Sequence, residues 1–260
     1  MYKIISYPVE YPVYVSVGAL HFPLHVLTET LGMFIGFRYF LYLRRRQGDK
    51  VDSGNRIWSV IGATFGALLG SRLLGALENP PGLLHADNLL LYIYQNKTIV
   101  GGLLGGLIGV ESIKKIVGER QSTGDLYTYP LILAMVIGRI GCFSMGIYEE
   151  TYGVPTSLPW GMNLGDGLLR HPVSLYEIVY LLLLWRLLRM VSRRYRLVSG
   201  ARFQLFMIGY LLFRFLLDFI KPGYRFAFGL GSIQLACLAG LIYYAPVIFF
   251  PSRLIEKQYA

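Results

Sequence analysis

Residues 57–77 read IWSVIGATFGALLGSRLLGAL, a run in which Arg72 is the only charged side chain. About 20 consecutive apolar residues in a helix suffice to cross the hydrocarbon core of a bilayer. Gly62, Gly66 and Gly70 recur at four-residue spacing, which places them on one helix face. The stretch therefore predicts a transmembrane helix with one face suited to the close approach of a neighbouring helix.

The rest of the chain is also strongly hydrophobic. Of its 260 residues 54% are hydrophobic and 15% are charged, and the mean hydropathy is +0.49. Soluble domains carry about 25% charged residues, so this composition excludes an ordinary soluble domain. The net charge of +10 comes from basic clusters between apolar runs, with no continuous basic face of the kind that binds nucleic acid.

Hydropathy predicts an all-α membrane protein with seven transmembrane helices in a single integral-membrane domain, residues 1–260. The basic clusters, such as Arg44–Arg46 and Arg193–Arg194, fall on one side of the membrane in this topology. By the positive-inside rule the N-terminus is then outside and the C-terminus cytoplasmic. The predicted helices are Phe22–Leu43, Ile57–Leu77, Thr98–Val117, Thr128–Gly146, Val173–Leu188, Phe203–Ile220 and Gly231–Phe250.

Two segments outside the helices have their own character. Leu83–Tyr94, after a Pro-Gly break, reads as one short amphipathic piece on the outer interface. Residues 147–171 form a long outer arm rich in Gly, Pro and polar residues, a loop length typical of lids and binding arms.

Charged residues inside the predicted helices mark candidate functional positions, because such groups are costly in a bilayer. At a rise of about 1.5 Å per residue, Arg139 and Arg214 lie roughly 10 Å below the outer ends of their helices. Other charges at or just above this depth are Arg72, Glu29, Asp218 and Lys221. Basic groups exceed acidic ones here, which favours an anion such as a lipid phosphate. The alternative is a buried ion-pair network that only fixes helix register.

Four motifs, in order between about His25 and Gln234, resemble those of the prolipoprotein diacylglyceryl transferases. They are Gly105–Gly109, Gly138–Phe143, Arg170–Glu177, and Phe213–Arg214 followed by Asp218 and Lys221–Pro222. Leu104 stands where that family commonly has a histidine, so the chain resembles a divergent member.

The resemblance implies an enzyme of the bacterial cytoplasmic (inner) membrane, with its active site on the extracytoplasmic side. It would move the diacylglyceryl group of phosphatidylglycerol to the lipobox cysteine thiol in a prolipoprotein signal peptide. A thioether would form and glycerol phosphate would leave. No cofactor, no metal and no nucleic acid partner is implied. The alternatives are a phospholipid transporter or scramblase, and a non-catalytic lipid-binding relative with another acceptor.

Residue roles follow from the same resemblance. Arg139 and Arg214 would act on the phosphate, Glu149 or Glu150 would orient groups or accept a proton, and His171 is a competing base. Cys142 is interpreted as a packing residue, because the substrate supplies the reacting thiol. Residues expected around the substrates are Arg72, Glu29, His25, Gly105, Gly106, Tyr176, Glu177, Asp218 and Lys221.

Overall fold

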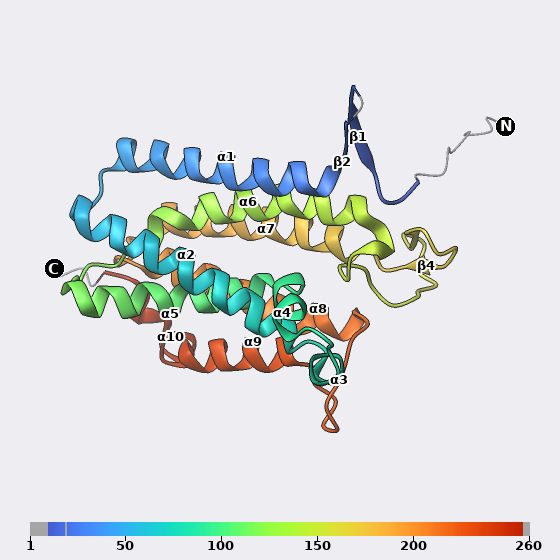
Figure 1. The fold of residues 1–260 in the computed structure, drawn as a ribbon. Helices are drawn as coiled ribbons and strands as arrows, with labels where there is room; N and C mark the ends of the chain where they lie inside the picture. Colours follow the sequence, from blue (N-terminus) through green and yellow to red (C-terminus); the bar gives the residue numbers. More distant parts are fainter. Residues whose placement is uncertain (1–9, 19, 257–260) are drawn as a thin grey trace. The chain divides into compact units, whose positions relative to one another are not determined.

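The computed structural model describes residues 10–18 and 20–256 and shows a mostly helical chain (Figure 1). The described residues form two compact units. Unit 1 comprises those within 1–39, 130–183 and 220–222, and unit 2 comprises those within 40–129, 184–219 and 223–260. The helices are α1 (Leu24–Gln47), α2 (Ser53–Ala76), α3 (Pro80–Leu84), α4 (Leu89–Gln95), α5 (Ile99–Val117), α6 (Asp125–Met145), α7 (Val173–Arg194), α8 (Ala201–Leu217), α9 (Ser232–Tyr243) and α10 (Ala245–Phe249).

Short elements complete the chain. The 3-10 helices are η1 (Gly146–Tyr148), η2 (Asp218–Ile220) and η3 (Pro251–Leu254). Two antiparallel hairpins, which the sequence did not predict, pair β1 (Tyr14–Val17) with β2 (Leu20–Pro23) and β3 (Met162–Asn163) with β4 (Leu169–Arg170).

The membrane character of the chain is clear in its helices. Within the described residues, three helical runs are long and apolar enough to cross a membrane: α2, α6 with η1, and α8 with η2. Helices also occur at the other predicted positions. The bounds of α1 and α5 are close to those expected, and α7 begins at Val173 as predicted but continues to Arg194. The chain is therefore an all-α membrane protein.

The prediction of one continuous helix over Gly231–Phe250 is wrong. Helix α9 ends at Tyr243, and α10 is a separate short helix with a proline near its start. Pro246 has no amide hydrogen to continue the hydrogen-bond ladder of α9, so the chain turns at Tyr244 and begins again.

The prediction of one amphipathic piece over Leu83–Tyr94 is also wrong, because α3 and α4 are separate helices. Asn79 accepts a hydrogen bond from the amide of Gly82, and Asn88 accepts one from the amide of Leu91. Each asparagine is thus the N-cap of its own helix, and the second cap starts a new helix rather than continuing the first.

Unit 1 is held together by close packing between α1 and α6. A Cβ atom added at Gly32 would lie 2.9 Å from the carbonyl oxygen of Ala134, and one at Gly36 would lie 3.1 Å from that of Pro130. Only glycine allows this approach, and in lipid such packing drives helix association. The first turns of α1 are thereby fixed along α6.

Unit 2 contains the glycine-rich pair α2 and α5, which lie side by side (Figure 1). A Cβ at Gly66 would lie 2.2 Å from the carbonyl oxygen of Gly105, and one at Gly105 would lie 2.2 Å from that of Gly66. Gly62 and Gly109 meet in the same way. The four-residue glycine spacing therefore makes a backbone-to-backbone contact, as the sequence predicts for this face.

Candidate active site

A cluster of polar side chains in unit 1 gathers where α6 ends. Arg139 and Cys142 are three residues apart in α6 and share a face, and Arg139 Nη1 donates a hydrogen bond to Cys142 Sγ at 3.5 Å. Gly146 follows the helix with φ +58°, a backbone conformation that favours glycine. The chain then passes through η1 and brings Glu149 back beside Cys142.

Gly141 lets α1 reach this cluster. A Cβ at Gly141 would lie 2.0 Å from Thr28 Oγ1 and 3.0 Å from His25 Cα. His25 in the first turn of α1 therefore sits directly against the backbone of α6, one residue before Cys142. The glycine in the Gly138–Phe143 motif thus positions the histidine as well as packing the helices.

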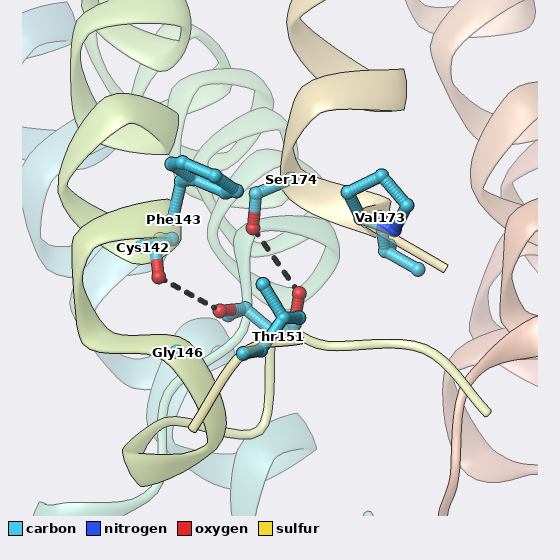
Figure 2. A pocket seen from close by; sticks show the side chains of 8 residues that line it. Cys142, Phe143, Gly146, Thr151, Val173 and Ser174 are labelled. Atoms are coloured by element: carbon cyan, nitrogen blue, oxygen red, sulfur yellow. Dashed lines mark hydrogen bonds between the residues drawn. The ribbon is translucent and has the colours of Figure 1, made fainter. Parts of the chain in front are cut away.

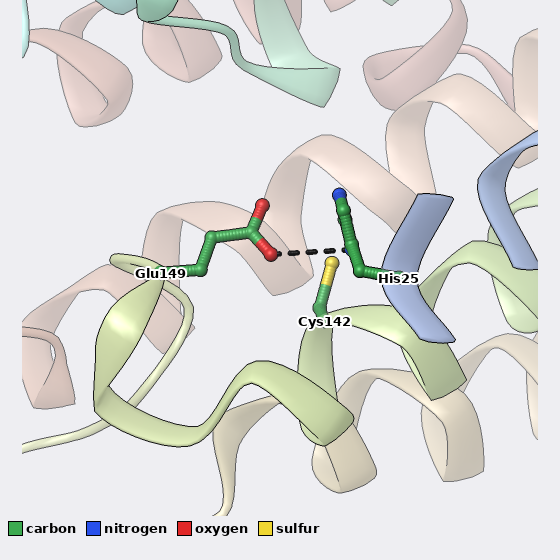
Figure 3. Close-up of side chains that lie close together, drawn as sticks. All are labelled: His25, Cys142 and Glu149. Atoms are coloured by element: carbon green, nitrogen blue, oxygen red, sulfur yellow. Dashed lines mark ion pairs between the residues drawn. The ribbon is translucent and has the colours of Figure 1, made fainter. Parts of the chain in front are cut away.

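His25 lies between two carboxylates. Its Nδ1 is 3.3 Å from Glu149 Oε2 (Figure 3). Its Nε2 is 3.4 Å from Glu29 Oε2. The His25 side chain is 13% exposed, so water has little access to the ring. Carboxylates facing both ring nitrogens fix the orientation of the imidazole.

Arg139 is anchored from the other side by α7. Its Nε lies 2.9 Å from Glu177 Oε1, and both side chains are buried. Breaking a buried ion pair by removing one partner costs about 3–5 kcal/mol, because it leaves an uncompensated charge. This pair fixes the position of the guanidinium and offsets its charge.

A small pocket lies beside the cluster, on the far side of Cys142. It is lined by residues of α6, the arm and the start of α7, including Cys142, Phe143, Thr151 and Ser174 (Figure 2). Ser174 Oγ donates to the carbonyl oxygen of Thr151, and Thr151 Oγ1 donates to that of Cys142. These bonds tie the beginning of the arm to the end of α6.

The structure distinguishes the two candidate acids after the motif. Glu149 is part of the cluster with His25, whereas Glu150 is exposed. His171 lies elsewhere in unit 1: its Nδ1 is 3.1 Å from the hydroxyl of Tyr176, which in turn accepts a hydrogen bond from Trp160 Nε1 at 2.7 Å.

The arm has its own ion pair. Arg170 Nε donates to Asp166 Oδ2 at 2.7 Å, and Arg170 Nη1 donates to the carbonyl oxygen of Gly153 at 3.3 Å. The hydrogen bond from Arg170 lowers the pKa of Asp166 below its ordinary value. Arg170 thus links the β3–β4 hairpin to the beginning of the arm.

The remaining predicted site residues lie in unit 2, apart from Lys221, which belongs to unit 1 and is half-buried. Arg214 is 4% exposed in α8. Asp218 begins η2, where its carbonyl oxygen accepts a hydrogen bond from Arg225 Nη2 at 2.8 Å. Arg225 also donates to the buried Gln234, so the sequence missed two residues that hold the loop between α8 and α9.

Arg72 and the α5 glycines have structural contacts in unit 2. Arg72 donates to the carbonyl oxygen of Tyr94 and lies 4.9 Å from the centre of its ring. Gly105 faces α2, whereas a Cβ at Gly106 would meet Ala63 O at 3.4 Å. Gly105 is therefore a packing position between α2 and α5.

Cys142 is a member of the cluster that the sequence interpretation left out. It lies in the same motif as Arg139, and its three-residue spacing from that arginine is the signal that could have found it.

Comparison with known proteins places this chain in a family. The family model described as "Prolipoprotein diacylglyceryl transferase" matches residues 12–250, nearly the whole chain. The chain belongs to the prolipoprotein diacylglyceryl transferase family. A phosphatidylglycerol–prolipoprotein diacylglyceryl transferase of Methylococcus capsulatus is 33% identical, over 98% of both chains. Transferases of the same name from Bordetella parapertussis (32%, 84% of both chains) and Photobacterium profundum (31%, 98% of this chain and 96% of the relative) are similar.

Membership of this transferase family indicates which kind of reaction the cluster could perform. The name of these relatives describes a reaction between phosphatidylglycerol and a prolipoprotein. Arg139 and Cys142 both stand in the Gly138–Phe143 motif, and His25 and Glu149 are beside them. The unit 1 cluster is therefore the candidate active site of a diacylglyceryl transferase.

Proposed function

We propose that this chain transfers the diacylglyceryl group of phosphatidylglycerol to the lipobox cysteine thiol of a prolipoprotein. The thiol sulfur forms a bond to the glycerol carbon, the bond from that carbon to the phosphate oxygen breaks, and glycerol phosphate leaves. The observation that carries the proposal is the family match over residues 12–250.

The arginines stabilise the leaving group in this proposal. Arg139 and Arg214 are buried, and preorganised cations in a dry site are the groups that best meet charge developing on a phosphate. Glu177 holds the Arg139 guanidinium in place. Tyr176, the residue before Glu177, contacts His171 and Trp160 and is proposed to support the site from the start of α7. Asp218, Lys221 and Arg72 contribute charge around the lipid headgroup.

The thiol must lose its proton before it attacks, because the thiolate is the nucleophile. Glu149 and His25 are the proposed groups that orient the thiol and favour loss of its proton, since they lie together at the end of α6. Glu29 orients His25 from the other side. His171 and Glu150 remain competing candidates from the sequence, and Gly105 and Gly106 are proposed to lie near the substrates.

The proposed setting is the bacterial cytoplasmic membrane. We propose seven transmembrane helices in one integral-membrane domain, with the N-terminus outside, the C-terminus cytoplasmic and the active site on the extracytoplasmic side. In support, basic residues concentrate in the loops on the proposed inner side. The substrates are then a lipid of the outer leaflet and the signal peptide of a prolipoprotein.

A transfer assay in proteoliposomes tests the function. The protein is supplied with labelled phosphatidylglycerol and a lipobox peptide, and both the peptide and the leaflet distribution of the label are followed. We expect a thioether-linked diacylglyceryl peptide. Lipid movement between leaflets without product would indicate a scramblase, and lipid binding alone would indicate a non-catalytic relative. Either result would overturn the proposal.

A further inference from the structure

Three side chains at the end of α6 point their metal-binding atoms at one another. In the part of the chain that the structure describes, His25, Cys142 and Glu149 form a group whose ligand atoms all lie within 4.8 Å of one another. Figure 3 shows the sulfur of Cys142 directed into the space between the Glu149 carboxylate and the His25 ring. All three residues belong to unit 1.

The geometry points to a zinc site formed by these three residues, in which the fourth zinc position receives the thiol of the substrate cysteine. The inference rests on the proposed transfer reaction for the role of the metal, and on the geometry alone for its presence. Imidazole, thiolate and carboxylate are the three ligand types that zinc uses in proteins.

The distance between the imidazole and carboxylate ligand atoms agrees with tetrahedral coordination. Zinc ligands lie about 2.0–2.3 Å from the metal, so neighbouring ligand atoms are about 3.3–3.8 Å apart. His25 Nδ1 and Glu149 Oε2 are 3.3 Å apart. Both atoms are buried, and neither has a hydrogen-bond partner among the described residues. A buried nitrogen and a buried oxygen that face each other without a hydrogen bond fit two ligands of one cation.

The surroundings of His25 fit a metal ligand as well. A histidine that binds metal through one ring nitrogen almost always donates its other N–H to a carboxylate or carbonyl. His25 Nε2 lies 3.4 Å from Glu29 Oε2, which leaves Nδ1 for the metal. Glu29 is thus the outer carboxylate of a carboxylate–histidine–zinc arrangement.

The charges also balance. Zinc carries two positive charges, and the Cys142 thiolate and the Glu149 carboxylate carry one negative charge each. Arg139 lies 3.5 Å from Cys142 Sγ, but its charge is offset by Glu177. Its N–H donates to the sulfur, as donors around metal-bound thiolates do, and tunes the ligand rather than replacing the metal.

Zinc would help alkylation of the substrate thiol by holding its sulfur as a thiolate. The substrate thiol binds the fourth position as a thiolate and releases its proton to water, because a coordinating thiol is deprotonated. The sulfur then forms its bond to the glycerol carbon, and the electron pair of the broken carbon–oxygen bond stays on glycerol phosphate. The thioether product is uncharged, binds zinc weakly and leaves. Zinc undergoes no redox change in this step.

Metal analysis of the purified full chain, without lipid or peptide, tests the site independently of transfer. After dialysis against zinc with the purification tag removed, we expect one zinc per chain. Cys142→Ala and His25→Ala should lower zinc affinity by more than the 10- to 100-fold typical of losing an outer-shell partner, and Glu29→Gln should fall within that range. Cys237→Ala, which removes the other buried cysteine, is the matched control and should keep its zinc.

Cobalt substitution tests whether Cys142 is a ligand without replacing Cys142, so the test does not depend on the folding of a Cys142 variant. The chain has two cysteines, so Cys237→Ala leaves Cys142 as its one thiol. A thiolate-to-cobalt charge-transfer band in that variant would assign the sulfur ligand to Cys142. Absence of the band, or zinc retained equally by the wild type, Cys142→Ala and His25→Ala, would overturn the inference. Transfer activity in protein that holds no zinc would overturn the role of the metal and leave the proposed function standing.

Discussion

Arg139 Nε and Glu177 Oε1 are 2.9 Å apart, and both side chains are almost fully buried. The pair joins the end of α6 to the start of α7 beside Cys142, so it links the two motifs that carry these residues. Arg139 can therefore have two roles, one in the stability of the fold and one in the transfer reaction. Variants of Arg139 and Glu177 test the two roles separately.

Arg139→Ala alone should abolish transfer and also destabilise the protein by about 3–5 kcal/mol, because Glu177 keeps a buried charge without its partner. Arg139→Ala combined with Glu177→Gln should recover most of the stability and none of the activity. Thermal unfolding in detergent and a transfer assay measure the two effects. Recovery of transfer in the double variant would show that Arg139 has only a structural role.

Gly141→Ala should reduce activity strongly. Its Cβ would lie 2.0 Å from Thr28 Oγ1 and 3.0 Å from His25 Cα, so the first turns of α1 must move away from Cys142. Gly138→Ala is the matched control in the same motif, since a Cβ there has no atom within 4 Å. Equal transfer rates for the two variants would contradict the proposed placement of His25 by Gly141.

Gly105→Ala should destabilise unit 2 by about 1–3 kcal/mol, the typical cost of inserting a methyl group into a well-packed contact. The new Cβ would lie 2.2 Å from the carbonyl oxygen of Gly66, and a backbone cannot give way as a side chain can. Gly102→Ala is the control on the same helix, where the nearest atom is 3.8 Å away. A similar unfolding temperature for both variants would contradict the packing of α2 against α5.

The arm of residues 147–171 should lose order in acid. Arg170 lowers the pKa of Asp166 in the folded protein, whereas an unfolded aspartate has a pKa of about 3.9. The ion pair therefore contributes fully above that value, and its contribution is lost as the pH falls through the lower, folded pKa. Proteolytic cleavage within residues 147–171 should increase over this range. Asp166→Asn should be cleaved readily at neutral pH, and equal protection of both proteins would contradict the role of the pair.

The sequence predicted the helices well because a membrane helix must satisfy its own backbone and shows this in a long apolar run. It also predicted the glycine face of α2 and α5, since four-residue spacing depends only on helix geometry. The division at Tyr244 was missed because Ala245–Phe249 is as apolar as the helix before it. Pro246 was the available signal.

The candidate site was predicted only in part. Arg139 and Glu29 were found because charge in an apolar helix is conspicuous. Glu177 was found through the family resemblance of its motif. The contact between His25 and Glu149 depends on how the chain turns after Gly146, and hydropathy carries no information about that turn. Cys142 was taken for a packing residue because a buried cysteine resembles a small apolar residue unless its neighbours are known.

The most direct test of the central claim is the mass of a lipobox peptide after incubation with phosphatidylglycerol and this protein. We predict that wild-type protein adds one diacylglyceryl group to the cysteine, while the folded double variant Arg139→Ala, Glu177→Gln leaves the peptide unchanged. An unmodified peptide with the wild type, or a fully modified one with the double variant, would contradict the account.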